Sequence, residues 1–297
     1  MKLKKWLLIL AALALAGRSS PQAEDERAHF HHVHLNVTNP EKSIQFYTSV
    51  FGATPTKFQG VSDALFTERS FILLNKVETP PPSELRSGIW HIGWGGVDVA
   101  NEYEWFKKKG VTFHTPLTPL RGPDNYYMYI SGPDKELVEI NTMGHHRFAH
   151  VHLFANDVNE TAAWYADHLG IPLRTRDVPK PKDMVAARGV WANAFRCDNV
   201  NFIIFGKPDT EPVPPWWPDP PLKALAPTRG RAIDHVAFSF RSIEPVFQRM
   251  KSAGVQIVEP ISVREDYKLK SFFVLGPNEV LVEIVEAKPI PEGIWEK

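Results

Sequence analysis

One short pattern occurs four times in this chain of 297 residues: an apolar strand entered by a histidine, followed by a helix that stops at a glycine. A pattern that recurs at a nearly fixed spacing indicates that one supersecondary unit has been copied along the chain. The chain is therefore predicted to fold as four similar modules. The interval from the histidine to the glycine is nearly the same in every copy, in the pairs His32 and Gly52, His91 and Gly110, His150 and Gly170, and His235 and Gly254.

The first copy shows what each module is expected to look like. His32, His34 and Asn36 alternate with apolar residues, which predicts a strand with one buried face. Asn39 is followed by a proline and fits the cap of a helix, and Gly52 supplies the left-handed conformation that ends that helix. Shorter apolar runs follow and predict further strands. Each module is therefore expected to be a strand, a helix and then more strands.

The distances between copies locate one insertion. The step from His32 to His91 equals the step from His91 to His150, whereas the third step, to His235, is much longer. Its main cause is the segment 208–228, whose prolines exclude a regular helix or a central strand. Trp216 and Trp217 lie at its middle. We expect either a lid over a pocket or a loop that anchors itself to the surface through these two side chains.

The closing segments indicate how the modules are grouped. The second copy ends in YISGPDKELVEIN and the fourth in VLGPNEVLVEIVE, so these two copies resemble each other most. This hierarchy predicts two domains of two modules each, at residues 29–145 and 146–288, with the insertion 208–228 inside the second domain. The modules are thus expected to pair in chain order.

Charge and the N-terminal segment limit the partners and the compartment. Lys plus Arg and Asp plus Glu both number 34, so the net charge is zero and nucleic acid is not an expected partner. Residues 1–23 have a positive start, an apolar run at residues 6–16 and small residues after it, which is typical of a secretory signal peptide. The run is too short to span a bilayer as a mature helix. We expect an exported protein, periplasmic or secreted, with no membrane association after cleavage; the alternative is an uncleaved N-terminal anchor.

Histidines and glutamates recur at matching positions in the two expected domains. The interval from His91 to Glu139 is the same as that from His235 to Glu283, and both glutamates stand in the sequence LVEI. Burying such a carboxylate without a cation would be costly, unless the glutamates face outward on edge strands. Two imidazoles and one carboxylate leave positions open on a divalent metal, as reactive sites do. We therefore predict one or two metal ions per chain, one bound by His32, His91 and Glu139 and the other by His150, His235 and Glu283.

Three local motifs together resemble the vicinal oxygen chelate (VOC) superfamily. They are the strand His-Val-x-Leu, the helix that ends in Phe-Gly or Leu-Gly, and the closing Gly-Pro-x-x-x-x-Val-Glu-Ile. The superfamily includes glyoxalase I, fosfomycin-resistance thiol transferases, bleomycin-resistance proteins and extradiol dioxygenases. The resemblance covers about residues 30–287 and implies an α+β fold of two VOC domains, each formed by paired βαβββ modules in a half-open barrel. It also implies a small-molecule substrate that chelates the metal through adjacent oxygens, with the family's ligands falling on the six residues named above.

The resemblance leaves more than one reaction open. Glyoxalase I resembles a four-ligand case with a second carboxylate, which the segments 71–75 and 201–205 do not offer. Two histidines and one glutamate resemble extradiol dioxygenases, in which a tyrosine lies shortly before the glutamate, as Tyr129 does; Phe273 replaces it in the second domain. The acid/base histidine of those enzymes is absent, since Arg121 and its neighbour stand at its position. A dioxygenase-like step with Fe²⁺ or Mn²⁺ is favoured. The alternatives are Zn²⁺ or Ni²⁺, a glyoxalase-like lyase or isomerase, and a non-catalytic binding protein of the bleomycin-resistance type.

Further polar residues receive roles from their positions. His34 and His152 follow a predicted ligand on the same strand face, so they are expected to contact the substrate as acid or base, or else to be core histidines. Tyr129 is the third candidate catalytic residue, because its hydroxyl can donate to a substrate oxygen. The protein is expected to be a monomer or a homodimer. The candidates for binding the substrate are Tyr127, Arg121 and Arg264.

Overall fold

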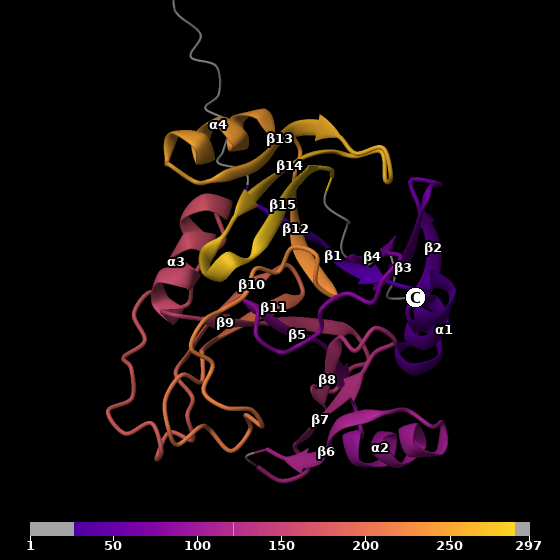
Figure 1. The fold of residues 1–297 in the computed structure, drawn as a ribbon, viewed down its shortest axis with the longest axis vertical. Helices are drawn as coiled ribbons and strands as arrows, with labels where there is room; N and C mark the ends of the chain where they lie inside the picture. Colours follow the sequence, from indigo (N-terminus) through magenta and orange to yellow (C-terminus); the bar gives the residue numbers. More distant parts are fainter. Residues whose placement is uncertain (1–26, 121, 289–297) are drawn as a thin grey trace, which may run out of the picture.

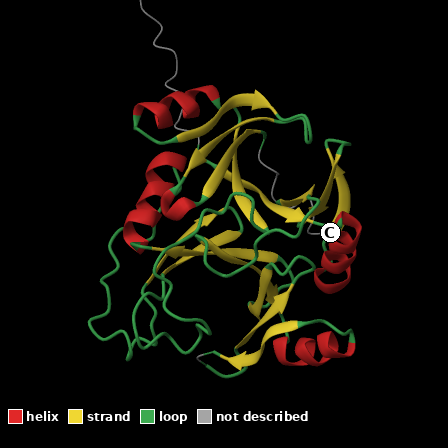
Figure 2. Ribbon diagram, viewed as in Figure 1, coloured by secondary structure: helices red, strands yellow, loops and turns green. Residues whose placement is uncertain are grey.

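The computed structural model describes residues 27–120 and 122–288 and shows four modules, each with a strand, a helix and further strands (Figure 1, Figure 2). Residues 1–23, predicted to be a signal peptide, and Arg121 lie outside the described residues. Among the helices of the described part, none is long and apolar enough to cross a membrane.

The module boundaries follow the four histidine strands. Module 1 comprises β1 (His29–Val37), α1 (Pro40–Phe51), β2 (Thr54–Phe58), β3 (Ser62–Phe66) and β4 (Phe71–Lys76). Module 2 comprises β5 (Ile89–Gly96), α2 (Val99–Lys108), β6 (Phe113–Pro119), β7 (Tyr126–Ser131) and β8 (Leu137–Thr142). Module 3 comprises β9 (Phe148–Ala155), α3 (Val158–Leu169), β10 (Ala192–Cys197) and β11 (Val200–Gly206). Module 4 comprises β12 (Ile233–Phe240), α4 (Glu244–Ser252), β13 (Ile257–Val263), β14 (Lys270–Leu275), the short 3₁₀ turn η1 (Pro277–Glu279) and β15 (Leu281–Glu286).

The helix ends agree with the caps read from the sequence. The Asn39 side chain accepts a hydrogen bond from the backbone N–H of Lys42 at the start of α1. Gly52 ends that helix in the left-handed conformation, with φ of 69°. Asp157 caps α3 in the same way as Asn39 caps α1. Local sequence therefore places the helices correctly.

The modules do not pair in chain order within the sheets, and this corrects the expected pairing of modules. Modules 1 and 4 form one open sheet, here called sheet I, in the order β13-β14-β15-β12-β1-β4-β3-β2. Modules 2 and 3 form sheet II, in the order β10-β11-β9-β5-β8-β7-β6. The connection 143–147 between modules 2 and 3 is too short to leave sheet II, whereas the long connections 77–88 and 207–232 carry the chain between the sheets. Each sheet is thus a half-open barrel made from two modules, as the fold class predicted.

The two sheets share one apolar core. Phe30 on β1 packs between the sheets, with its ring centroid 6.0 Å from Phe148, 5.6 Å from Phe202 and 6.0 Å from Phe238. Because neighbouring residues of a strand point to opposite faces, the apolar residues of β1 face this core and its histidines face the concave side of sheet I. The alternation read from the sequence therefore directs the histidines of each module toward the concave side of its sheet.

A buried carboxyl group between modules 1 and 2 is expected to make stability depend on pH. Glu136 accepts hydrogen bonds from the Tyr47 hydroxyl at 2.8 Å and from the backbone N–H of Asp134 at 3.0 Å. Burial raises the pKa of Glu136 to about 7 despite these bonds. Folding therefore favours the protonated form, so this contribution to stability is fully present below about pH 4.5 and is lost as the pH rises through about 7.

Replacing Glu136 with glutamine is expected to remove this pH dependence. Between pH 5 and pH 8 the free energy of unfolding of the wild type should fall relative to the variant by on the order of 3 kcal/mol. Urea unfolding at the two pH values measures the difference. Glu104→Gln, an exposed change on α2, is the control and should run parallel to the wild type. The expectation would be contradicted if the free energy of unfolding of Glu136→Gln changed with pH as much as that of the wild type.

Candidate metal centres

Four side chains of sheet II converge at one point, here called centre II: His91, Glu139, His150 and His152. Glu139 Oε2 lies 2.7 Å from Nε2 of His91 and 3.0 Å from Nε2 of His150. The Nε2 atoms of His91 and His150 lie 3.4 Å apart. All four residues are buried, and one donor atom from each lies within 4.8 Å of the others. Three imidazoles and a carboxylate so close together are suited to a divalent metal.

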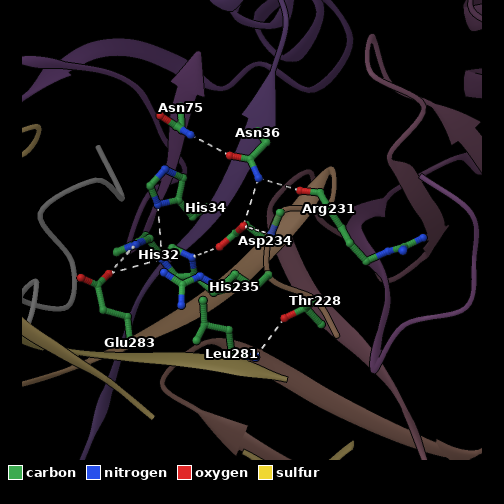
Figure 3. Close-up of polar contacts among 12 residues, drawn as sticks. His32, His34, Asn36, Asn75, Thr228, Arg231, Asp234, His235, Leu281 and Glu283 are labelled. Atoms are coloured by element: carbon green, nitrogen blue, oxygen red, sulfur yellow. Dashed lines mark hydrogen bonds and ion pairs between the residues drawn. The ribbon is translucent and has the colours of Figure 1, made fainter. Parts of the chain in front are cut away.

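Sheet I carries the equivalent cluster, here called centre I: His32, His34, His235 and Glu283 (Figure 3). Glu283 Oε2 lies 3.2 Å from Nε2 of His32 and 3.4 Å from Nε2 of His235. Nδ1 of His34 lies 3.2 Å from Nε2 of His235. Donor atoms of the three histidines lie within 4.8 Å of one another, and all four residues are buried.

The predicted grouping of the ligands was wrong, although all six residues lie in the two clusters. We expected His32 beside His91 and Glu139, and His150 beside His235. The structure exchanges His32 and His150 between the two clusters, because β1 pairs with β12 and β9 pairs with β5. His32 therefore joins His235 and Glu283, and His150 joins His91 and Glu139.

Each centre also has a fourth candidate donor, which was not among the three ligands predicted for each ion. His34 and His152 were predicted as acid/base residues or core histidines, and the structure places both within reach of an ion in their clusters. They stand on β1 and β9, beside Leu73 and Ile203 of the neighbouring strands. Each sheet thus offers three histidines and one carboxylate.

The protonation states of the clusters fit a metal. Burial lowers the pKa of His32 and lowers that of His91 to about 4. Burial raises the pKa of Glu139 and Glu283, but close contact with two histidines each outweighs this effect and holds each pKa below its ordinary value. Metals bind neutral imidazole and ionised carboxylate, so these groups are in their ligand forms. His235 differs, because Asp234 and Glu283 overcome burial and raise its pKa to about 9.

Unpaired atoms in centre I support the same conclusion. Nε2 of His32 and Oε2 of Glu283 are buried and lack a hydrogen bond, since their 3.2 Å approach does not have hydrogen-bond geometry. Buried polar atoms are rarely left unpaired unless another group, such as an ion, satisfies them. The residues present therefore fit a divalent metal.

A β-bulge precedes each of the four first-strand ligands. The register between β5 and β9 skips Trp90 and Ala149, and the register between β1 and β12 skips His31 and Asp234. A bulge re-aims a side chain that would otherwise point to the opposite face of the sheet. Each ligand histidine is thus preceded by a residue whose side chain can also reach the concave side.

Centre II opens into a cavity of about 830 Å³. The centre contributes Glu139 and His152 to the wall, and Tyr127 and Tyr129, the tyrosines predicted to contact the substrate, line the same cavity. Tyr129 pairs with Glu139 across β7 and β8, and its ring lies 5.1 Å from that of His91. The rest of the wall is mostly apolar and includes Trp90, Pro119, Leu120, Val190, Phe205, Pro215 and Trp216.

Trp90 is a wall residue that sequence reasoning missed. Its indole nitrogen is buried without a hydrogen-bond partner, and the strand pattern alone would have directed its side chain away from the cleft. Only the bulge brings it to the same side as His91. The signal in the sequence was a tryptophan directly before a ligand, which is ambiguous without the register.

Arg264 is engaged on sheet I and does not line this cavity. It forms an ion pair with Glu259 at 2.6 Å, donates to Ser271 Oγ at 2.9 Å and lies over the ring of Phe273. Its predicted contact with a substrate remains untested. Arg121, predicted for the same role, lies outside the described residues.

The inserted segment 208–228 is anchored and forms part of the cavity wall. Trp217 is 4% exposed, and its indole N–H donates to the Pro220 carbonyl at 3.0 Å. Trp216 donates to the Arg188 carbonyl at 3.0 Å, and its ring lies 5.3 Å from that of Trp90. The structure agrees with the self-anchoring loop, and one of its two tryptophans faces the cavity of centre II.

Comparison with solved structures finds the same fold in many chains, including the following two. Glyoxalase I from Zea mays has 15% sequence identity and a TM-score of 0.66, with coverage of 88% of this chain and 93% of that chain. A proposed dioxygenase from Bacillus subtilis has 14% identity and a TM-score of 0.58, with coverage of 88% and 85%. At such identities the likeness concerns the fold alone. Comparison with curated protein sequences gives no match.

A family profile covers both halves of the chain. The profile described as the Glyoxalase/Bleomycin resistance protein/Dioxygenase superfamily matches residues 29–140 and 147–284. These ranges include all eight residues of centres I and II. The superfamily is the one that the local motifs resemble, and most of its members are metal-dependent enzymes that act on small molecules. The chain belongs to the Glyoxalase/Bleomycin resistance protein/Dioxygenase superfamily.

Proposed function

We propose that the chain is a metal-dependent enzyme whose reaction takes place at centre II, on a small molecule with two adjacent oxygens. The observation that carries this proposal is the position of Glu139 and His152 in the wall of the 830 Å³ cavity. Substrate pockets are typically largely apolar with a few polar groups that fix orientation, and this cavity has that composition. A divalent metal held by His91, Glu139 and His150 would stabilise negative charge that develops on the substrate oxygens.

The side chains around centre II have distinct tasks in this proposal. His152 faces the cavity, and neither of its ring nitrogens has a hydrogen-bond partner. Burial lowers its pKa well below the ordinary value, so it is neutral and can accept a proton from the substrate. Burial raises the pKa of Tyr129, which keeps its hydroxyl protonated as a donor. Trp90 offers a second donor through its unpaired indole N–H.

We favour a dioxygenase-like reaction with Fe²⁺ or Mn²⁺, and a glyoxalase-like isomerase or lyase is the second candidate. Centre II supplies one carboxylate, Glu139. On the closing strand of module 3 the equivalent position, beside His152, is occupied by Ile203, so that strand adds no second carboxylate. This donor set supports the first candidate. The similarity of fold to glyoxalase I of Zea mays keeps the second in view. Each sheet is completed within one chain, so neither reaction needs a second copy.

The two reactions can be separated on one preparation. The purified protein would be loaded in turn with Fe²⁺, Mn²⁺, Zn²⁺ and Ni²⁺ and offered catechols and hemithioacetals. Oxygen uptake with a catechol would support the dioxygenase-like reaction. Isomerisation of a hemithioacetal without oxygen uptake would support the glyoxalase-like one. Tight binding of these probes without turnover under any metal would leave a binding protein of the bleomycin-resistance type and would refute the enzyme.

Replacing His152 with alanine tests its role as the proton acceptor. Turnover should fall by about 10²- to 10⁴-fold, as is usual when a general base is lost. Metal content should stay at the wild-type level, because three other donors hold the ion. Elemental analysis and initial rates on the same sample give both values. Loss of the metal together with the activity would instead identify His152 as a ligand.

We also propose that the protein is exported. The support is the N-terminal sequence, with its positive start, apolar run and small residues. Expression with residues 1–23 intact, followed by cell fractionation and N-terminal sequencing, tests this. A shortened protein outside the cytoplasm is expected. A full-length protein in the cytoplasm or the membrane would refute it.

A further inference from the structure

We infer that centre I is a closed structural metal site, which joins the first and last modules of the chain and does not turn over substrate. Centre II opens into a cavity, where a bound metal could meet a substrate. Centre I has an equivalent donor set, but the contacts around it differ in three respects. These are its covering, the groups that hold its histidines and the distance in the sequence between its ligands.

The concave side of sheet I is filled over centre I. Tyr267, in the loop between β13 and β14, donates its hydroxyl to Glu283 Oε1 at 2.5 Å. This loop is tied to module 1, because the Ser62 hydroxyl donates to the Asp266 carbonyl. The Glu283 side chain is 0% exposed, whereas that of Glu139 is 10% exposed and faces a cavity. Residues that pack with Tyr267 in this covering are Phe58, Ala64, Leu73, Ala237, Leu269 and Val285.

The bulge residues of centre I hold the ligand histidines from behind. Asp234 Oδ1 lies 2.6 Å from Nδ1 of His235 (Figure 3). Nδ1 of His31 lies 2.8 Å from Nδ1 of His32. Asp234 is itself fixed by the Asn36 amide at 3.0 Å and the backbone N–H of Gly230 at 2.5 Å. A partner on Nδ1 fixes the ring and directs Nε2 toward a metal, which raises affinity.

Centre II lacks this support at the same two places. Its bulge residues are Trp90 and Ala149, and the Nδ1 atoms of His91 and His150 have no hydrogen-bond partner. The four bulges are equivalent in position, so the difference lies in the side chains alone. Centre I is therefore built to hold an ion firmly, and centre II leaves its ligands less constrained beside an open cavity.

The ligands of centre I connect the two ends of the folded chain. His32 lies on the first strand, in module 1, and Glu283 lies on the last strand, in module 4. A cross-link between such distant residues removes much of the conformational freedom of the unfolded chain. His91 and His150 of centre II belong to consecutive modules and are much closer in the sequence. An ion in centre I should therefore stabilise the fold more than an ion in centre II.

The donor set points to Zn²⁺ as the occupant of centre I. Structural zinc sites have four protein ligands and no open position, and imidazole and carboxylate are both ligands of zinc. His32, His34, His235 and Glu283 supply these four donors. Tyr267 and Asp234 act as positioning residues in this inference, because Tyr267 contacts Glu283 and Asp234 contacts Nδ1 of His235.

Zinc retention tests the inference without any substrate. The full protein is loaded with Zn²⁺, dialysed against EDTA and analysed for metal, and its thermal unfolding is recorded before and after. One equivalent of Zn²⁺ should remain bound to the wild type after this dialysis. Removing that remaining equivalent should lower Tm. Glu283→Gln should lose that equivalent and the effect of zinc on Tm. Glu139→Gln, the matched change in centre II, should keep both.

A second variant keeps the test informative if Glu283→Gln fails to fold. Tyr267→Phe preserves the packing of the ring and removes only the hydrogen bond to Glu283. Its bound Zn²⁺ should pass to a chromogenic chelator about 10- to 100-fold faster than in the wild type, as for other outer partners of metal ligands. A purely structural role of the hydroxyl would change Tm alone.

The inference is overturned if the retained zinc is insensitive to Glu283→Gln and Tyr267→Phe, or if removing it leaves Tm unchanged. Turnover of a substrate that depends on Glu283 and not on Glu139 would also overturn it. Because zinc retention is measured without substrate, failure of the proposed reaction at centre II would leave this result standing.

Discussion

Glu139→Gln is expected to reduce the metal affinity of centre II by about 100-fold or more. Glu139 lies within 3.0 Å of both ligand histidines and is the carboxylate of the cluster. Changes of outer partners alone cost about 10- to 100-fold, so loss of a ligand should cost at least as much. Turnover of a substrate found in the metal screen should fall by about 10³-fold, since the metal contributes several kcal/mol to charge stabilisation. Calorimetric titration with Mn²⁺ and initial rates measure the two effects.

Glu136→Gln is the matched control for this prediction. Glu136 stands shortly before Glu139 in the sequence and is buried as well, but its carboxyl faces Tyr47 and is not part of the cluster. Metal affinity and turnover of this variant should equal those of the wild type. If Glu139→Gln bound Mn²⁺ as tightly as the control, centre II would not be the working metal site.

Trp217→Ala is expected to destabilise the protein by about 3 to 5 kcal/mol, the usual cost of truncating a buried large aromatic residue. Trp217 is 4% exposed, and its ring lies 5.4 Å from that of Phe154 and 6.5 Å from that of Trp90. It also donates the hydrogen bond to Pro220 that closes its own turn. Removing it should release the inserted segment from sheet II. Urea unfolding of the metal-loaded protein measures the loss.

Trp216→Ala tests whether Trp216 mainly lines the cavity while Trp217 mainly anchors the inserted segment. Trp216 is only half-buried, so its truncation should cost about 1 to 2 kcal/mol, and its main effect should be weaker binding of substrate. Trp105→Ala on α2, where the ring is 44% exposed, is the surface control and should stay within about 0.5 kcal/mol of the wild type. Equal losses of stability from Trp216→Ala and Trp217→Ala would contradict this division of roles.

Local sequence was sufficient for every feature that depends on neighbouring residues. The alternation after His32 predicted a strand with a polar face, and Asn39 and Gly52 marked the ends of a helix that the structure confirms. The repeat of His91 and Glu139 in a second copy, as His235 and Glu283, indicated the candidate donors. These features follow from side-chain alternation and capping, which act over a few residues.

Tertiary structure alone decided which modules share a sheet, and so which donors meet. The histidine strands of the four modules are nearly alike, so no local pattern says whether β1 pairs with β5 or with β12. The contacts of Tyr267 with Glu283 and of Asp234 with His235 could not be predicted for the same reason. Tyr267 reaches Glu283 from a separate loop, and Asp234 turns toward His235 only because of a bulge in the register with β1.

The sequence by itself therefore determined the repeating module, the fold class and the residue types of both centres. The pairing of modules, the open cavity at centre II and the covering of centre I depended on contacts between residues far apart in the chain. The physical reason is that a strand's alternation fixes which face is polar, whereas hydrogen bonding between strands fixes which polar faces come together.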